Sequence, residues 1–401
     1  MVIRKVGVEE ELMLVDAETG ALMSVSHRAL RAHQDRSAAL TEASAGDAQQ
    51  GKQSAESEES QQSENNHDDA DVAEVAQELF LHQIETATNP SDSLADVGDE
   101  VRRTRRSAGT AARAAGAAMV ATATPVLGDV DVRVTPKTRY QRIVDEYGEI
   151  GRHAIVGGMH IHVDVGGDDE AVGVLDRIRP WLPVILAISA NSPFWRGVDT
   201  GYASWRAQVW GRWPSAGPAE SFGDFAGYRA ATQALIDSGA ALDPGMLYLD
   251  ARLAASYPTV EIRVADVCTE VEDVVLVAAL CRALVETATR SWRSGEPAPD
   301  WRSDLLRAAH WRAARVGMSG RLVDPVRRSL APARAVVEGL IGHTREALRE
   351  SGDVEAVEDA VERLLARGAG AARQRAVAEA TGSLEAVVSD LRERTEASWH
   401  R

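Results

Sequence analysis

Residues 7–12 read Gly7-Val-Glu-Glu-Glu-Leu12, within an N-terminal segment where apolar and polar residues alternate. The alternation over residues 1–16 predicts a β-strand, because successive side chains of a strand point to opposite faces. Glu9 and Glu11 then share one face, about 7 Å apart. Two such carboxylates are costly to bury alone, whereas a divalent cation between them, Mg²⁺ or Mn²⁺, removes that cost. The alternative interpretation is an edge strand with solvated acids.

Two further predicted strands carry side chains that could bind a metal. The strand at residues 158–165 contains His160 and His162 on one face. Such a pair can bind a metal, a phosphate or a substrate carboxylate, and it can equally be hydrogen-bonded structure. The strand at residues 82–88 adds the single carboxylate Glu85, which by itself does not distinguish a ligand from a structural acid.

Arginines accompany these acids in two places. Glu261 and Arg263 share one face of a strand predicted over residues 259–265. They form either a structural ion pair or a metal-binding carboxylate beside a guanidinium that holds phosphate. A loop rich in tryptophan carries Arg206 and Arg212, and it is either a recognition surface for an anionic substrate or a packed aromatic corner.

Composition excludes several classes of protein. The 401 residues carry a formal net charge of −17, which argues against nucleic acid as the main partner because phosphate contacts need a basic face. Only two cysteines are present, so a disulfide framework or a four-cysteine zinc site is excluded. No apolar run approaches the roughly 20 residues of a membrane span. Because three glutamates lie near the start, where a signal peptide would be apolar, we expect a cytoplasmic protein.

Strands interleave with helices without a regular βαβ period, which predicts an α+β fold with an antiparallel sheet. We expect a catalytic domain over residues 1–295 and a helical C-terminal region over residues 296–401. Residues 41–71 contain alanine as their only apolar side chain, so we predict a disordered acidic insertion there. A short helix is expected near residues 27–33 and another over residues 72–79. Further helices are predicted at residues 93–115, 140–151, 171–179, 183–190, 225–238 and 271–290, and after residue 325.

Five stretches, in order along the chain, together resemble the glutamate–cysteine ligase type 2, or carboxylate–amine ligase, family. They are GVEEELMLVDAETG (7–20), HQIETAT (82–88), RYQRIVDEYGEIGRHAIVGGMHIHVDV (139–165), GYASWRAQVWGRWPSAGPA (201–219) and YPTVEIRVADVCT (257–269). The resemblance implies an incomplete antiparallel β-barrel, a curved sheet of the glutamine synthetase type, with the active site inside it. It also implies an ATP- and Mg²⁺-dependent ligase that activates the γ-carboxylate of glutamate as an acyl phosphate for attack by an amine. Cysteine is the leading acceptor and γ-glutamylcysteine the expected product.

The resemblance also assigns roles to individual residues. The metal-binding carboxylates would be Glu9, Glu11, Glu85 and Glu261. Arg263 would stabilise the transferring γ-phosphoryl group, and Arg206 would hold a substrate carboxylate. The expected further contacts to substrate or phosphate are His160, which could also ligate metal, His162 and Arg212. Because an acyl phosphate must be kept from water, residues 195–218 are a candidate lid. A homo-oligomeric state is left open.

Two competing interpretations come from other classes. A metal-dependent hydrolase could use the pair His160 and His162, but that class needs an eight-stranded (β/α) barrel, further histidines and often a bridging lysine. Lysine occurs only at positions 5, 52 and 137. The absence of both G-x-x-x-x-G-K-[ST] and G-x-G-x-x-G removes the P-loop and Rossmann sites. A non-enzymatic helical scaffold would leave all the inward-facing charges without a purpose.

Overall fold

The fold is built on one antiparallel sheet whose central strand is the N-terminal segment. The structure is a computed structural model that describes residues 3–53, 74–128 and 132–400. The strand order is β2-β3-β1-β5-β9-β8, and β4 pairs with the end of β1. The strands are β1 (Val6–Val15), β2 (Glu74–Gln77), β3 (Gln83–Ala87), β4 (Ala118–Val120), β5 (Gly158–Asp164), β8 (Ala251–Leu253) and β9 (Thr259–Asp266). Among the described residues no pairing joins β2 to β8, so the sheet is open.

This arrangement confirms the predicted α+β class with an antiparallel sheet. It differs from the parallel barrel that the metal-hydrolase interpretation requires. The predicted strands at residues 1–16, 82–88, 158–165 and 259–265 correspond to β1, β3, β5 and β9. Their alternating side chains, with one face apolar, are the pattern that a half-covered sheet needs.

Helices cover one face of the sheet and bury its apolar side chains. Val6, Val8, Leu12 and Leu14 of β1 belong to the main hydrophobic core, which the long buried helix α9 (Val271–Arg293) also lines. Around α9 pack α2 (Leu94–Ala114), α5 (Asp168–Ile178) and α6 (Leu182–Ser189). The odd-numbered residues of β1 therefore point to the opposite face, away from the helices around α9.

Glu10 is the one acid of the N-terminal triplet that faces the helices. Its carboxylate accepts two hydrogen bonds from the Arg105 guanidinium of α2, at 2.8 and 2.5 Å. Arg105 also donates to the carbonyl oxygens of Cys268 and Thr269. Neither side chain of the Glu10–Arg105 pair is more than 2% exposed, so the pair is a buried and fully hydrogen-bonded ion pair that ties β1 to α2.

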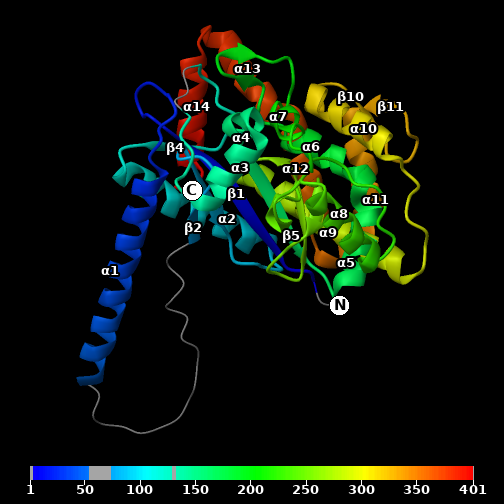
Figure 1. Cartoon of the computed structure of the whole chain (residues 1–401), viewed down its shortest axis with the longest axis horizontal. Coiled ribbons are helices and arrows are strands. Elements are labelled where there is room, and N and C mark those ends of the chain that lie inside the picture. The colour runs from blue at the N-terminus through cyan, green and yellow to red at the C-terminus, as the bar shows by residue number, and fades with distance from the viewer. Residues whose placement is uncertain (1–2, 54–73, 129–131, 401) are drawn as a thin grey trace.

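Two predictions near the N-terminus need correction. Residues 74–77 form strand β2, where a helix over 72–79 was expected, because hydrogen bonding to β3 outweighs the local preference. The helix expected near residues 27–33 is much longer, since α1 runs over Ser26–Gln53 and extends away from the body of the molecule (Figure 1). It therefore takes in residues 41–53 of the predicted disordered insertion, a stretch rich in good helix formers such as alanine and glutamine. Residues 54–71 of that insertion lie outside the described residues.

The remaining elements surround the second half of the sheet. They are α3 (Thr138–Tyr147), α4 (Glu149–His153), β6 (Phe194–Trp195), β7 (Val198–Asp199), α7 (Arg206–Trp210) and α8 (Phe225–Asp237). The C-terminal region comprises α10 (Ser303–Val316), the hairpin β10 (Arg321–Val323) and β11 (Leu330–Pro332), α11 (Ala333–Ser351), α12 (Val354–Arg367), α13 (Gly370–Thr381) and α14 (Leu384–Ala397). Both α11 and α12 pack on α9, and α14 packs on β4. None of the helices in the described ranges is long and apolar enough to cross a membrane.

Candidate active site

Strand register brings the predicted acids and histidines together on the face of the sheet that points away from the helices around α9. In the pairing of β1 with β3, Glu11 lies opposite Glu85. In the pairing of β1 with β5, Glu9 lies opposite His160. His162 in turn lies opposite Glu261 of β9. Because the side-chain period of a strand is two, this register puts all of these side chains on one surface.

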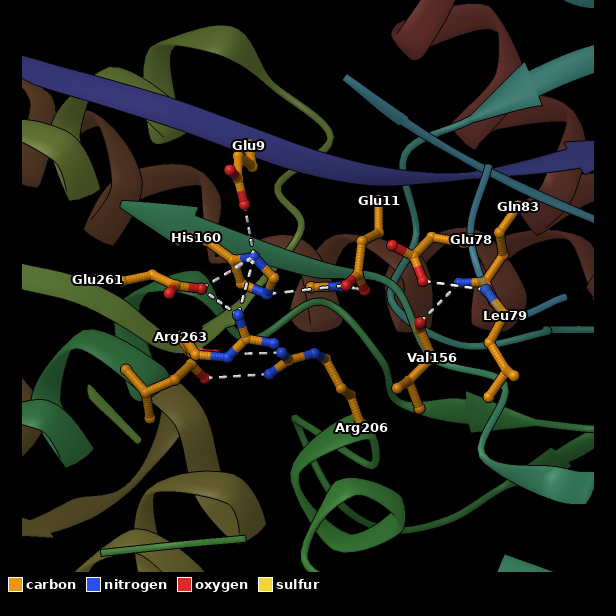
Figure 2. Close-up of polar contacts among 12 residues, drawn as sticks. Glu9, Glu11, Glu78, Leu79, Gln83, Val156, His160, Arg206, Glu261 and Arg263 are labelled. Carbon is orange, nitrogen blue, oxygen red and sulfur yellow. Dashed lines mark hydrogen bonds and ion pairs between the residues drawn. The ribbon is translucent and has the colours of Figure 1, made fainter. Parts of the chain in front are cut away.

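Glu9 is the centre of this group. One carboxylate oxygen lies 3.0 Å from His160 Nδ1 (Figure 2). The other lies 3.3 Å from His162 Nε2. The His162 ring is oriented from its other side, where Nδ1 lies 3.0 Å from the Thr259 hydroxyl. Glu11 is fixed differently, because one of its oxygens accepts a 2.6 Å hydrogen bond from the Gly158 amide. The carboxylates and rings are thus held in place by the strands themselves.

Two overlapping groups of side chains fit a divalent cation. In Glu9, Glu85 and His160, one ligand atom from each residue lies within 4.8 Å of the others, and the same holds for Glu9, His162 and Glu261. His160 Nε2 is buried and makes no hydrogen bond, as expected of a nitrogen kept for a ligand, whereas His162 Nε2 faces Glu9 at 3.3 Å. Carboxylate oxygens with an imidazole nitrogen are a donor set that suits Mn²⁺ or Mg²⁺. Glu9 belongs to both groups, so it would contribute a ligand atom to a cation held by either.

The surroundings of the carboxylates shift their pKa values in different directions. Burial raises the pKa of Glu9, but hydrogen bonds from His160 and His162 outweigh burial and hold that pKa far below its ordinary value. Burial also opposes ionisation of Glu261, yet the charges of Arg263 and Arg252 lower its pKa to about 2. Glu85 behaves in the opposite way, because burial and then the neighbouring Glu78 raise its pKa well above the ordinary value. A cation near Glu85 would reverse that shift and release the proton.

Burial and the charge of Arg263 lower the pKa of His160, which favours its neutral imidazole form. Its Nδ1–H can then donate to Glu9, which leaves the Nε2 lone pair free. A neutral imidazole with one nitrogen hydrogen-bonded to a carboxylate is the usual form of a metal-ligating histidine.

Two arginines hold Glu261 from different strands. Arg263, the next same-face residue of β9, forms an ion pair with it and lies 3.5 Å from His160. Arg252 of β8 makes a bidentate contact with the Glu261 carboxylate at 2.7 and 3.2 Å. The sequence analysis missed Arg252 because β8 has only three residues and was not predicted. Only the pairing of β8 with β9 identifies it, since Arg252 lies directly opposite Glu261.

The other two predicted arginines lie elsewhere. Arg206, at the start of α7, is 2% exposed, and its guanidinium donates to the carbonyl oxygens of Arg263 and Val264 at 3.1 and 3.3 Å. It therefore lies beneath the site and is not among the residues that line the cavity. Arg212 is exposed and also does not line it. Their roles as substrate contacts stay predictions.

A cavity of about 330 Å³ opens over the face that carries these residues. Its lining includes every predicted acid and histidine together with Arg263, and it adds residues that the sequence analysis did not single out as site residues. These are Glu78, Arg139, Tyr140, Tyr248, Arg252 and Tyr257. Trp210 and Trp213, from the loop expected to act as a lid, form another part of the wall. Five glutamates and three arginines thus line one cavity.

This arrangement suits chemistry on phosphorylated molecules. The carboxylates and imidazoles provide places for cations, and the arginines provide donors for anionic oxygens. Transfer of a phosphoryl group is catalysed mainly by positioning and by neutralisation of charge, which such a set supplies without a P-loop.

Comparison with known proteins agrees with this interpretation. The family model described as glutamate-cysteine ligase family 2 matches residues 5–390. A Nocardioides sp. protein provisionally named glutamate–cysteine ligase 2-1 is 49% identical over 99% of this chain and 97% of its own length. A Frankia alni protein with the provisional name glutamate–cysteine ligase 2-2 is 47% identical over 96% of this chain and 95% of its own.

Solved structures share the fold at low identity. The glutamate–cysteine ligase of Francisella tularensis, solved with AMP, aligns over 100% of this chain and 94% of its own with a TM-score of 0.58 and 13% identity. A bifunctional glutathione synthetase from Pasteurella multocida aligns over 99% of this chain and 52% of its own, with a TM-score of 0.65 and 15% identity. The match of the family model over nearly the whole length, together with these relatives, shows that the chain belongs to glutamate–cysteine ligase family 2.

Proposed function

We propose that this protein is an ATP-dependent glutamate–cysteine ligase that forms γ-glutamylcysteine, ADP and phosphate. The observation that carries the proposal is the cavity in which Glu9, His160, His162 and Glu261 meet Arg263 on one face of the sheet. Family membership and the names of the relatives support this choice of reaction. The open antiparallel sheet would then correspond to the incomplete barrel of the glutamine synthetase type.

In this mechanism the residues of the chain position two successive substitutions. An oxygen of the glutamate γ-carboxylate attacks the γ-phosphorus of ATP, and ADP leaves. The amine of the acceptor then attacks the acyl carbon, phosphate leaves, and the nitrogen loses a proton. Arg263 would donate to the transferring phosphoryl oxygens, where negative charge is held during the first step.

The four proposed metal ligands are Glu9, Glu11, Glu85 and Glu261, with His160 and His162 completing the set. Divalent ions bound there would neutralise the phosphate oxygens of ATP. Glu9 is ionised and hydrogen-bonded in advance, so its geometry is already fixed before a ligand arrives. Arg252 would keep Glu261 in place from the neighbouring strand.

The aromatic wall would exclude water from the acyl phosphate. Trp210, Trp213 and Tyr248 pack against one another, with ring centroids 4.5 Å apart for Trp210–Tyr248 and 5.3 Å apart for Trp213–Tyr248. They lie in the Trp-rich loop and its neighbour, on the rim of the cavity that the carboxylates line. A dry wall beside the reacting groups limits hydrolysis of the intermediate.

The test is turnover of ATP by the purified protein with Mg²⁺, glutamate and cysteine. We expect release of ADP that depends on both amino acids, and γ-glutamylcysteine in the products. Absence of ADP release with Mg²⁺ or Mn²⁺ would contradict the ligase assignment. A panel of amines assayed by phosphate release identifies the acceptor, and preference for another amine would leave the ligase class standing while replacing cysteine.

A further inference from the structure

A buried glutamine of the C-terminal region contacts the loop that precedes α7. Gln374 lies on α13, and its Nε2 donates to the main-chain oxygen of Asn191 at 2.9 Å and to the Asn191 Oδ1 at 2.8 Å. Its Oε1 has no hydrogen-bond partner in the described part of the chain. The donor end alone therefore sets the orientation of the amide, because a flipped amide would bring Oε1 against two acceptor oxygens.

The backbone of α13 also lies close to Asn191. A Cβ atom added to Gly370 would lie only 2.1 Å from Asn191 Oδ1, so glycine is needed for this approach. The next amide, that of Ala371, donates to the carbonyl oxygen of Ala190 at 3.0 Å. The first turn of α13 is thus closely packed against this loop.

Asn191 connects α13 to the end of β9. Its side-chain amide donates to the carbonyl oxygens of Ala121 and Val267, at 3.2 and 2.8 Å, and to the Thr269 hydroxyl at 3.1 Å. Its main-chain amide donates to Asp266 Oδ2 at 2.8 Å. These hydrogen bonds together fix the orientation of the Asn191 side chain, and Gln374 is the residue that binds its side-chain oxygen.

Asp266 links Asn191 to the start of α7 through hydrogen bonds. Its carboxylate accepts hydrogen bonds from the hydroxyls of Ser192 and Ser204, at 2.7 and 2.8 Å. The Ser192 hydroxyl in turn accepts from the main-chain amide of Arg206 at 3.1 Å. None of these four residues is more than 2% exposed, so water does not compete for the bonds.

Arg206 connects this hydrogen-bond network to the candidate active site. Its guanidinium donates to the main-chain oxygen of Arg263 (Figure 2). The guanidinium groups of Arg206 and Arg263 also lie over the ring of Trp210, at 5.6 and 5.9 Å from its centroid. The backbone that presents Arg263 to the cavity is therefore held by a residue that Asn191 and Asp266 position.

We propose that Gln374 is a positioning residue for the reaction, acting through Asn191, Asp266 and Arg206 on the placement of Arg263. The C-terminal helices are then a working part of the active site and not an appendage to it. A purely structural role would predict that changes at Gln374 alter stability alone. The inference rests on the proposed ligase function for its kinetic readout only.

The experiment compares two full-length variants that each remove a buried contact of the C-terminal region. Q374M keeps the length of the side chain and removes the hydrogen bonds to Asn191. V361A is the control, because Val361 is 2% exposed on α12, a C-terminal helix that packs on α9 and α11. Hydrogen–deuterium exchange of residues 190–210, the melting temperature and the kinetics of ATP turnover are measured for both.

We expect faster exchange at residues 190–210 in Q374M only. We also expect kcat of Q374M to fall by about tenfold or more with KM for ATP within about twofold, because small misplacements of a catalytic group are costly. V361A should lower the melting temperature and keep kcat. If Q374M does not fold, Q374E, which has the same length and places an oxygen against the two acceptors, takes its place in the same measurements.

Unchanged exchange over residues 190–210 in the folded variant would overturn the proposal, whether or not the protein is a ligase. So would a kcat within twofold of the parent protein, or an equal loss of kcat in V361A. If the parent protein shows no ADP release, the proposed function fails, and the exchange comparison still decides whether Gln374 holds this segment.

Discussion

Two neighbouring glutamates of β1 should respond to the same substitution in opposite ways. Glu9 points into the cavity and belongs to both groups of candidate metal ligands. Glu10 points into the helices and pairs with Arg105. Replacing either by glutamine keeps the shape of the side chain and removes its charge, so E9Q and E10Q separate a functional carboxylate from a structural one.

For E9Q the expected loss is in cation binding and turnover. Five glutamates and three arginines line the cavity, a formal excess of two negative charges that the substitution reduces to one. Both candidate ion sites lose their shared ligand. Removal of one preorganised electrostatic contact costs about 10²–10³ in kcat, and we expect a loss of at least that size. The stability of the protein without metal should fall by less than in E10Q, because E9Q loses the ionised carboxylate that His160 and His162 favour but glutamine can still hydrogen-bond to these rings.

For E10Q the expected loss is in stability. Arg105 is fully buried, and its two bonds to Glu10, at 2.8 and 2.5 Å, are the contacts that balance its charge. Breaking one side of a buried pair costs about 3–5 kcal/mol, because the remaining charge stays buried without a partner. Protein that remains folded should bind cations normally, since Glu10 does not reach the cavity.

The assays are Mn²⁺ titration followed by electron paramagnetic resonance, denaturant unfolding without metal, and ADP release. The reasoning is refuted if E9Q binds Mn²⁺ and turns over ATP within twofold of the parent protein. It is refuted equally if E10Q unfolds at the same denaturant concentration as the parent, or if folded E10Q loses Mn²⁺ affinity. The exposed Glu149 of α4, changed to glutamine, provides a control that should alter neither property.

Three further substitutions test the site from other directions. Burial and Glu78 raise the pKa of Glu85. Between the ordinary glutamate pKa and the raised one, Glu85 ionises in the unfolded chain but stays protonated in the folded chain, so metal-free protein loses stability as pH rises through this range. E85Q should flatten this decline in melting temperature and weaken Mn²⁺ binding, and an unchanged pH profile would contradict the raised pKa. R263K keeps a positive charge but loses the planar fork, so we expect kcat to fall by about 10²-fold with little change in KM for ATP, and a kcat equal to that of the parent would remove Arg263 from catalysis. G157A would place a Cβ atom 2.7 Å from the carbonyl oxygen of Glu11 and 3.0 Å from that of Thr122; the clash is with backbone, so we expect a stability loss of about 1–3 kcal/mol in denaturant unfolding, and parent-like stability would show that β1 can move aside.

Much of the sheet was predictable because its signals are local. The alternation in residues 6–15 and the same pattern at Thr259–Asp266 predict strands with one apolar face. Each predicted strand also carried its acid or histidine on one known face, so the candidate ligands could be named in advance. The helix over residues 72–79 was wrong because β2 exists only through its pairing with β3, which lies outside any local window.

The positions of the arginines relative to the site depend on contacts between residues far apart in the sequence, which no local pattern contains. Arg206 and Arg212 both occur in a loop rich in tryptophan, yet one is buried beneath β9 and the other is exposed. Arg252 belongs to a three-residue strand, and its bond to Glu261 follows from the pairing of β8 with β9. Gln374 has no signal at all in the sequence, because its partner Asn191 lies 183 residues away.

The sequence by itself determined the strand faces, the identity of the carboxylates and histidines, and the family resemblance, because residue type and a period of two are local properties of the chain. Only the tertiary structure decided which of those residues meet. Antiparallel register aligned Glu9 with His160 and His162 with Glu261, and the packing of α2 turned Glu10 into a structural ion pair. The physical reason is that a cation site needs several oxygens and nitrogens within a few ångströms, and chain segments far apart in sequence reach that spacing only when the sheet and its core have formed.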